Sequence, residues 1–192
     1  MISIPPHIVL ETERLVLRTI DESFAQRCLD YYERNREFLA PWNPTPSPDF
    51  YTLEFQRLKL NFDTELRAQD RAVRFWLFRK DDLQQEYILG GFAFSNIVRG
   101  AFQSCHLGYY MDGAAINQGY ITEALRRGIA FAFDELLLHR IEANVMPRNV
   151  RSRRVLEKLG FEYEGLSRRY LKIAGVWEDH IHYVMLNPRE DI

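Results

Sequence analysis

The chain has 192 residues, the length of one compact domain (1–192), and 46% of them are hydrophobic and 27% charged. This balance excludes a disordered polymer and a fibre, because disorder requires fewer apolar residues and more charge. The formal net charge of −2 argues against direct nucleic-acid binding, and no apolar run approaches the ~20 residues that cross a bilayer.

The cysteines and the first residues bear on the cellular compartment. Cys28 and Cys105 lie far apart and have no partner at metal-ligand spacing, so we expect neither a disulfide framework nor a zinc site. Residues 1–6 have neither a basic flank nor an apolar core, which argues against a secretory signal. We therefore expect a cytoplasmic protein that holds no metal and no membrane anchor.

The first half of the chain predicts a strand, two helices and an irregular segment between them. The strand is expected over 14–18, and Asp21 is placed to cap a helix that continues to about Leu39. Residues 41–48 contain four prolines, each of which fixes φ and lacks a donor, so this segment is a linker or the wall of a binding cleft. Linker is the safer interpretation. The second helix has apolar residues at spacings of three and four: Phe55, Leu58, Phe62 and Leu66.

From Ala72 onward the pattern changes to strands. Three runs separated by turns predict an antiparallel meander, and a long helix with one apolar stripe follows. A strand, a short helix ended by Gly160 and a final strand pair joined at 174–175 complete an α+β, or mixed α/β, order with a largely antiparallel sheet. The expected elements are strands 73–78, 87–94 and 106–111, a helix with Ile121, Leu125, Ile129, Ala132, Phe133 and Leu136, strand 140–146, helix 152–159, and strands 164–173 and 176–185.

One stretch combines a strand, a short loop and a helix that begins beside a glycine. Backbone N–H groups at a helix start lie at the positive end of the dipole, and Gly119 lets the main chain approach an anion closely. This turn therefore predicts a phosphate or pyrophosphate site. Gly108, inside the strand, predicts a bulge that opens a slot in the sheet. Taken alone, these residues also fit an ordinary strand-to-helix turn.

Two motifs follow each other in this part of the chain. The first is the loop 116–121, Ile-Asn-Gln-Gly-Tyr-Ile, and the second is Asn149 with a short helix that ends in Leu-Gly-Phe at 159–161. Together they resemble the GNAT (Gcn5-related) N-acetyltransferases, whose loop reads Gln or Arg, two residues, Gly, one residue, and Gly or Ala. More narrowly, the chain is similar to the RimJ/RimL group, which acetylates the N-terminal amine of ribosomal proteins. That similarity rests on 139–141, Asn144, 146–147, 151–152, 159–162, 164–165, 170–171, Trp177 and 179–180.

The resemblance implies a GNAT-like fold that binds acetyl-CoA, the acetyl donor, in a splayed sheet. Strand backbone groups would pair with the pantetheine arm, loop amides would take the pyrophosphate, and the Asn149 side chain would bond to the cofactor arm, although Asn149 also suits a helix N-cap. Ile116 and Ile121 depart from the family pattern, which predicts weaker or differently shaped pyrophosphate contacts. The implied cofactor-binding residues are Tyr109, Tyr110, Met111, Asn117, Gln118, Gly119, Tyr120, Ile121, Thr122 and Asn149.

The resemblance also implies residues that handle protons and orient groups during catalysis. In many GNAT enzymes a tyrosine at the position of Leu156 protonates the leaving thiolate, which leucine cannot do, and the RimL-like pattern gives this role to Ser152. Without the resemblance, Ser152 is a solvated serine in the first turn of a helix. Asn144 stands where some relatives carry a glutamate base; it can orient a water but cannot accept a proton at useful pH.

The general base has several candidates. Strand alternation places Glu142 on the same face as Asn144, where it can act through a water, although a solvated strand carboxylate is an equally good interpretation. Asp179 and His180 are the others, since a histidine titrates near neutrality. A dedicated base is not required, because an α-amine has a pKa of about 7.7–8.0, against about 10.4 for a lysine. This difference favours an N-terminal amine as acceptor.

Three functions follow from these residues. The first is acetyl transfer from acetyl-CoA to the N-terminal α-amine, with alanine first, of a small-subunit ribosomal protein. The second is transfer to a small amine such as an amino acid, a polyamine or an antibiotic, since a fold does not fix its function. The third is a module that binds CoA, or contacts the ribosome, without turnover. We expect a monomer or homodimer that binds neither nucleic acid nor membrane directly.

Overall fold

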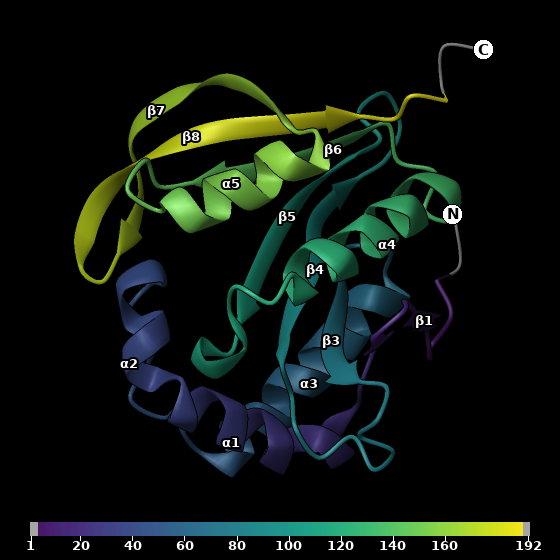
Figure 1. Ribbon diagram of the computed structural model, residues 1–192, viewed down its shortest axis with the longest axis vertical. Coiled ribbons are helices and arrows are strands. Elements are labelled where there is room, and N and C mark those ends of the chain that lie inside the picture. Colours follow the sequence, from purple (N-terminus) through teal and green to yellow (C-terminus); the bar gives the residue numbers. More distant parts are fainter. Residues whose placement is uncertain (1–3, 190–192) are drawn as a thin grey trace.

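The strands form one sheet in the order β1-β2-β3-β4-β5-β6-β8-β7 in the computed structural model, which describes residues 4–189 (Figure 1). Neighbouring strands run antiparallel except β5 and β6, which are parallel. The predicted α+β fold with a largely antiparallel sheet is confirmed. The strands are β1 (Val9–Glu11), β2 (Leu15–Arg18), β3 (Val73–Arg79), β4 (Gly90–Val98), β5 (Ser104–Met111), β6 (Arg140–Val145), β7 (Glu162–Ile173) and β8 (Val176–Leu186).

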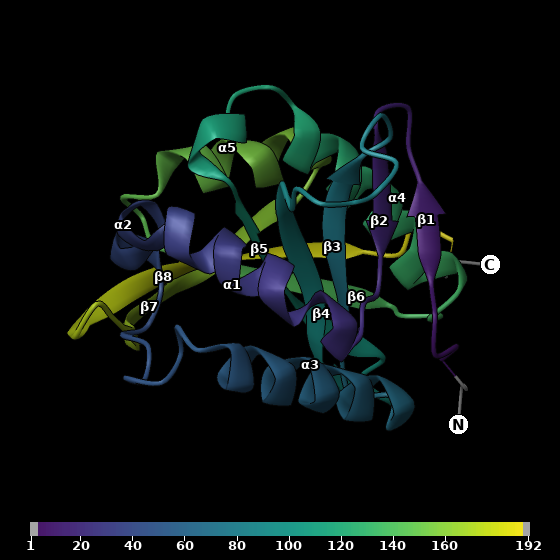
Figure 2. The ribbon, with the colours of Figure 1, turned by 90° about the horizontal axis from the view of Figure 1, so that it is seen from below.

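Helices cover both faces of this sheet. Along β3, Phe75 joins the core cluster beneath α4, while its neighbour Trp76 joins the cluster beneath α1 and α3, because successive side chains point to opposite faces. Figure 2 shows α1 and α3 on one side of the strands and α4 and α5 on the other. The helices are α1 (Ala25–Arg34), α2 (Arg36–Leu39), α3 (Leu53–Ala68), α4 (Tyr120–Asp134) and α5 (Val150–Leu159), with 3-10 turns η1 (Glu22–Phe24), η2 (Ala40–Trp42) and η3 (Gly113–Ala115).

None of the helices in the described part of the chain is both long and apolar enough to cross a membrane. Cys28 and Cys105 are both buried free thiols, and they belong to different core clusters.

The helix predicted over 21–39 is divided into η1, α1 and α2. Asp21 does act as a cap, since its Oδ1 accepts a hydrogen bond from the backbone N–H of Ser23. The division between α1 and α2 falls at Asn35, whose buried side chain donates to the Tyr31 carbonyl (2.9 Å) and accepts from the Gly113 N–H (2.8 Å). These two bonds attach α2 to the segment that follows β5.

The predicted second helix is α3, but only part of its apolar stripe faces the protein, since Phe55 and Leu66 are half-buried. Leu58 and Phe62 are 60% and 58% exposed, whereas Gln56 and Leu60 are buried against the protein. A buried polar side chain is tolerated when it is hydrogen-bonded, and Gln56 donates to the Phe50 carbonyl at 2.6 Å. Hydrophobic spacing therefore predicts the helix but does not fix its buried face.

The strand predicted over 87–94 begins at Gly90 and continues to Val98. The bulge predicted at Gly108 is wrong, because Gly108 pairs in regular register with Ala93. The irregularity lies in β4 instead, between Ser95 and Val98, where Asn96 has a φ of +50°. At that point β4 has one more residue than the facing part of β5, which distorts the hydrogen-bond ladder while the two strands stay paired.

Candidate active site

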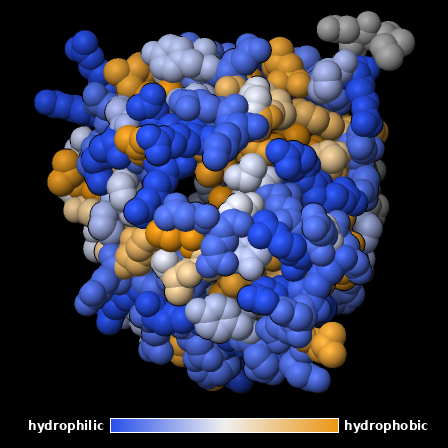
Figure 3. Space-filling model, in the orientation of Figure 1, coloured by the Kyte–Doolittle hydropathy of each residue, from blue (hydrophilic) through white to orange (hydrophobic). Residues whose placement is uncertain are grey.

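A cleft opens where β5 and β6 diverge. The two strands pair only over Ser104–His106 and Arg140–Glu142, after which β5 stays with β4 and β6 stays with β8. The resulting cavity measures about 680 Å³. Figure 3 shows a hollow on this face, between α5 and the segment leading into α4, with a mostly hydrophilic rim. The predicted slot thus exists, but divergent pairing creates it rather than a glycine bulge.

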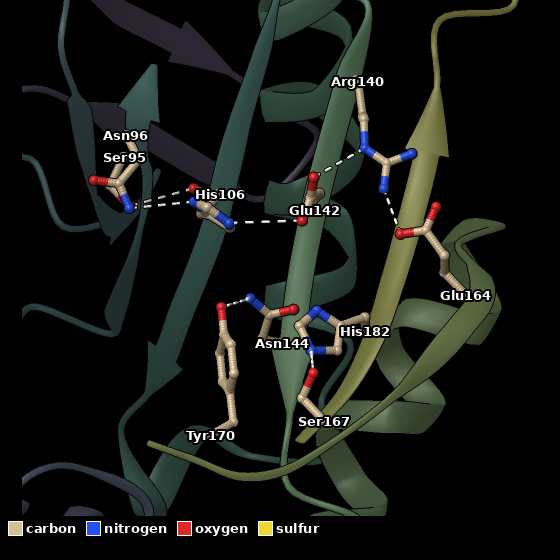
Figure 4. A network of polar contacts seen from close by, with 10 residues as sticks. All are labelled: Ser95, Asn96, His106, Arg140, Glu142, Asn144, Glu164, Ser167, Tyr170 and His182. Carbon is tan, nitrogen blue, oxygen red and sulfur yellow. Dashed lines mark hydrogen bonds and ion pairs between the residues drawn. The ribbon is translucent and has the colours of Figure 1, made fainter. Parts of the chain in front are cut away.

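An ionic clasp closes the narrow end of the cleft, where the pairing of β5 and β6 stops. His106 of β5 faces Glu142 of β6, with 3.6 Å between His106 Nε2 and Glu142 Oε2 (Figure 4). Arg140 donates to the same carboxylate from Nε at 2.9 Å and also pairs with Glu164. Glu142 is therefore engaged by two neighbours, and its side chain does not line the cleft.

A second end of the cleft, separate from the wide end beside Trp42, is formed by the start of α4. Gly119 is the N-cap residue with φ +81°, and no side chain caps the helix, so its first-turn amides face the cleft. A Cβ at Gly119 would lie 3.4 Å from the Arg14 guanidinium, which donates to the Gln118 carbonyl at 3.0 Å and pairs with Glu123 at 2.7 Å. Asn117 is also left-handed, with φ +61°. These contacts hold a tight turn whose residues line the cleft.

Three cations line the same end of the cleft. Arg151, Arg154 and Lys158 are exposed side chains of α5, and none of them forms an ion pair within residues 4–189. Together with the positive end of the α4 dipole they make this end suited to an anion with several phosphate charges. The residues present therefore fit the diphosphate and phosphate groups of a coenzyme A ester.

The middle of the cleft joins β5 to the start of α5. Asn149 caps α5 through Oδ1, which accepts from the Ser152 N–H at 3.2 Å, leaving its Nδ2 donor for a ligand. The Tyr109 hydroxyl lies 2.7 Å from Ser152 Oγ and donates to the Ser152 carbonyl at 3.0 Å. Burial raises the pKa of Tyr109 well above its ordinary value, so this phenol keeps its proton. Leu156 is fully buried in the core.

The proline-rich segment forms a wall at the wide end of the cleft, so its interpretation as a linker is wrong. Trp42 and Asn43 line the cleft together with Phe38 and Leu39 at the end of α2. The Asn43 carbonyl accepts from the Ala174 N–H at the tip of the β7–β8 hairpin (3.0 Å). In Figure 1, α2 accordingly lies close to that hairpin.

The floor of the wide end carries a buried polar chain that begins on α3. Asp63 pairs with Lys59 at 3.2 Å and with Arg74 at 2.9 Å, and Arg74 lines the cleft. Arg74 Nη1 lies 3.4 Å from the Tyr110 hydroxyl, which is 3.4 Å from that of Tyr32. Burial lowers the pKa of Lys59 to about 8. The floor is thus polar, with its charges paired below the surface.

The structure brings most of the sequence-predicted site residues to one cleft. Gln118 and Glu142 are the exceptions, since the Gln118 side chain turns back to the Ala114 carbonyl and Glu142 lies in the clasp. Sequence reasoning missed Trp42 and Arg74 as lining residues, and it missed the contact of the Tyr109 hydroxyl with Ser152. The predicted residues that line the cleft are Tyr109, Tyr110, Met111, Asn117, Gly119, Tyr120, Ile121, Thr122, Asn144, Asn149 and Ser152.

Comparison with known proteins gives this site a family. Residues 14–162 match the family described as Acetyltransferase (GNAT) domain. The chain is 38% identical over 183 residues to the [ribosomal protein uS5]-alanine N-acetyltransferase of Escherichia coli K12, covering 95% of this chain and 93% of that protein.

Two solved structures share the whole architecture. The ribosomal-protein-S5-alanine acetyltransferase from Vibrio fischeri has a TM-score of 0.89 and 36% identity, covering 95% of this chain and 98% of that one. Mycobacterium smegmatis RimJ in complex with CoA-disulfide has a TM-score of 0.87 and 27% identity, covering 96% of this chain and 88% of that one. The chain therefore belongs to the GNAT acetyltransferase family, within which it is similar to the RimJ/RimL group, and it is an acyltransferase.

Proposed function

We propose that this chain, 1–192, is a single acetyltransferase domain that moves the acetyl group of acetyl-CoA to the N-terminal α-amine of a ribosomal protein whose first residue is alanine. The observation that carries the proposal is the 38% identity, over 95% of the chain, to the E. coli enzyme named for the alanine of uS5. The place of action is the cytoplasm, where ribosomes are.

The two ends of the cleft support a division of labour between donor and acceptor. The turn at Gly119, with the cations of α5, binds the pyrophosphate and phosphate of acetyl-CoA, the acyl donor. Backbone groups of 109–111 pair with the pantetheine arm, and Asn149 Nδ2 donates to it. The acceptor enters from the wide end, past Trp42, because this end is polar at its floor and lacks the phosphate-binding turn.

Ser152 delivers a proton to the departing thiolate. Support comes from its position, because Ser152 lines the cleft and its Oγ lies 2.7 Å from the Tyr109 hydroxyl. That phenol gives its one proton to the Ser152 carbonyl, so the serine O–H is held by the Tyr109 oxygen and turns to the thiolate when the thiolate forms. Burial raises the pKa of Tyr109, so the phenol stays neutral beside the serine.

Asn144 and Glu142 take different roles in the proposal. Asn144 Oδ1 is buried and has no hydrogen-bond partner among the described residues, which suits an acceptor amine that brings N–H donors. Glu142 is engaged by Arg140 and His106, which supports a role in holding β5 and β6 together rather than in proton transfer.

Thiol release with a panel of acceptors tests the proposal. A peptide that begins with alanine and continues with a small-subunit ribosomal-protein sequence should release CoA, whereas the same peptide with a formylated N-terminus should not, even if it contains lysine. Turnover of amino acids, polyamines or aminoglycosides in place of the peptide would refute the acceptor assignment. If acetyl-CoA raises the Tm but no amine releases thiol, the chain is a binding module.

A further inference from the structure

Proton removal from the amine requires an acceptor group that reaches the cleft. Glu142 is held in the clasp, and Asp179 Oδ1 accepts from the Arg169 N–H at 2.8 Å; neither carboxylate lines the cleft. His180 of β8 does line it, although the side chain is only 3% exposed. The hydrogen bonds and the protonation state of His180 therefore decide what this buried ring can do in the cleft.

The tautomer of His180 follows from one hydrogen bond. Its Nδ1 lies 3.1 Å from the carbonyl oxygen of Glu178, and a carbonyl can only accept, so Nδ1 carries the proton. The neutral ring therefore presents a lone pair on Nε2. Nε2 makes no hydrogen bond to any residue within 4–189.

The charges around His180 leave the ring neutral. Burial lowers its pKa and outweighs the opposing influence of the Glu178 carbonyl and carboxylate and of Asp179, while His182 lowers it further. Glu178 is itself paired with Arg148 at 2.9 Å. From β7, the ring of Tyr170 packs 5.6 Å from that of His180.

A second unused acceptor lies on the same face of the sheet. Asn144 is directly opposite His182 in the β6–β8 ladder, and His180 is two residues further along β8, so Asn144 and His180 are diagonal neighbours, roughly 7–8 Å apart by ordinary sheet geometry. Tyr170 connects them, because its hydroxyl accepts from Asn144 Nδ2 at 3.4 Å (Figure 4) while its ring contacts His180. Asn144 Oδ1 and His180 Nε2 are two hydrogen-bond acceptors without a donor among the described residues. A primary amine, which has N–H groups to donate, matches this pair.

We infer that His180 is the general base of the acetyl transfer, taking a proton from the acceptor amine through Nε2, while Asn144 Oδ1 accepts a second N–H of the same nitrogen. The inference rests on the proposed function. The neutral amine forms a bond to the acetyl carbon, the carbon–sulfur bond breaks, and the sulfur takes the Ser152 proton. The nitrogen proton, made acidic by the new bond, passes to His180, and solvent restores both residues.

His180→Asn tests the inference with little loss of structure. The asparagine amide can still donate to the Glu178 carbonyl, but it offers no basic nitrogen. We expect kcat to fall about 100-fold or more, the magnitude usual for a general base, with the dissociation constant of acetyl-CoA and the Tm close to wild type. Because burial lowers the pKa of His180, wild-type kcat should fall only at a pH below the ordinary range of an imidazole, where His180 becomes protonated, and this acid limb should be lost in the variant.

His182→Asn is the matched control, because His182 bonds to Ser167 at 2.8 Å and does not line the cleft. It should keep wild-type kcat and an acid limb, which moves to slightly higher pH because His182 lowers the pKa of His180. A His180→Asn enzyme with kcat within about threefold of wild type, or with its acid limb intact, would overturn the inference.

The tautomer provides a measurement that needs neither a variant nor turnover. Nitrogen NMR of the wild-type protein should find His180 neutral at pH 7 and protonated on Nδ1; a proton on Nε2 would refute the assignment. Rates are compared with wild type on whichever amine it acetylates. A wild type that acetylates only small amines therefore refutes the ribosomal acceptor and leaves the test of His180 intact.

Discussion

At the scale of single residues, the contact between Tyr109 and Ser152 gives a plain serine its proposed role. The Tyr109 hydroxyl donates its one proton to the Ser152 carbonyl, so at the 2.7 Å contact Ser152 Oγ is the donor and the serine side chain is held in place. The phenol stays protonated because burial raises its pKa. The family resemblance identified Ser152 from sequence, but the tyrosine partner comes from a different strand, 43 residues earlier, and only packing shows it.

The Ser152→Ala variant should lose turnover and keep binding. Removing Oγ takes away the proton of the leaving group without touching the phosphate end, so kcat should fall about 100-fold while the dissociation constant of acetyl-CoA stays within about twofold. Steady-state kinetics and calorimetry measure the two quantities. Ser23→Ala, in the distant turn η1, is the control and should behave as wild type. Equal losses in turnover and affinity would contradict the role assigned to Ser152.

At the scale of elements, the start of α4 depends on a left-handed residue. Gly119 has φ +81°, a conformation that costs other residues roughly 1–2 kcal/mol. That conformation turns the first amides of α4 toward the cleft and lets the Arg14 side chain pass close by. Ile116 and Ile121, which depart from the family pattern, both line the cleft, and Gly119 is the single glycine of the loop 116–121.

Gly119→Ala should therefore weaken acetyl-CoA binding. An alanine here relieves its backbone strain by rotating the turn, which points the amides away from the phosphates of acetyl-CoA. A loss of about 1.4 kcal/mol in binding free energy corresponds to a tenfold loss of affinity. Gly100→Ala is a matched control, since Gly100 also has positive φ (+71°) and open space around it but lies in the turn between β4 and β5. Both variants should lose stability, and only Gly119→Ala should lose affinity. Unchanged affinity in Gly119→Ala would contradict the phosphate turn.

Elements with a strong local pattern could be predicted from sequence, and their mutual placement could not. The stripe of α4 is confirmed at Leu125 and Ile129, which are buried, because a 3.6-residue period is a local property. The face of α3 was only partly predicted, because its buried side includes Gln56, whose partner is a backbone carbonyl. Gly108 predicted a bulge, but the slot forms because β5 and β6 pair with different strands beyond residues 106 and 142. Such pairing depends on residues far apart in the sequence, so a short segment does not reveal it.

At the scale of the whole molecule, two carboxylates join distant parts of the chain around the cleft. Asp112, after β5, accepts hydrogen bonds from Arg34 (2.7 Å) and Tyr87 (3.0 Å) as well as from Asn35. Glu123 on α4 accepts from the Thr12 hydroxyl at 2.6 Å and from Arg14. Burial disfavours charge at both, but these bonds outweigh it and lower the pKa of Asp112 and of Glu123.

This linkage predicts the sensitivity of the fold to acid. A carboxyl whose pKa is lowered in the folded state contributes its full stabilisation at any pH above its ordinary pKa, which is 3.8 for Asp and 4.5 for Glu. That stabilisation is lost as the pH falls through the lower pKa of the folded state. The free energy of unfolding should thus drop below about pH 4.5. Asp112→Asn and Glu123→Gln should each lower the free energy of unfolding at pH 7 by about 1–3 kcal/mol. Each should also make that free energy depend less on pH below about 4.5, as urea titrations at several pH values can show. Exposed Glu65→Gln should change neither quantity, and an equally steep drop in the double variant would contradict the linkage.

The wall of the acceptor end also belongs to this scale. Trp42 and Asn43 lie in a segment whose prolines resemble a linker, but distant parts of the chain hold it at the cleft. The β7–β8 hairpin, about 130 residues later, bonds to Asn43, and Arg148 packs over the Trp42 ring. His180 also reaches the cleft through a long-range contact, because β8 pairs with β6. The turn at Gly119 could be predicted from sequence because it is a continuous motif, whereas the proposed acceptor end is assembled from separate elements.

The claim on which these roles depend is that the cleft between β5 and β6 binds acetyl-CoA with its diphosphate at the turn of Gly119. Isothermal titration of the wild-type protein with acetyl-CoA and with acetyl-pantetheine, which lacks the nucleotide and the diphosphate, tests it most directly. We predict one site per chain for acetyl-CoA and at least about tenfold weaker binding of acetyl-pantetheine. No heat of binding with acetyl-CoA, or equal affinity for the two compounds, would contradict the claim.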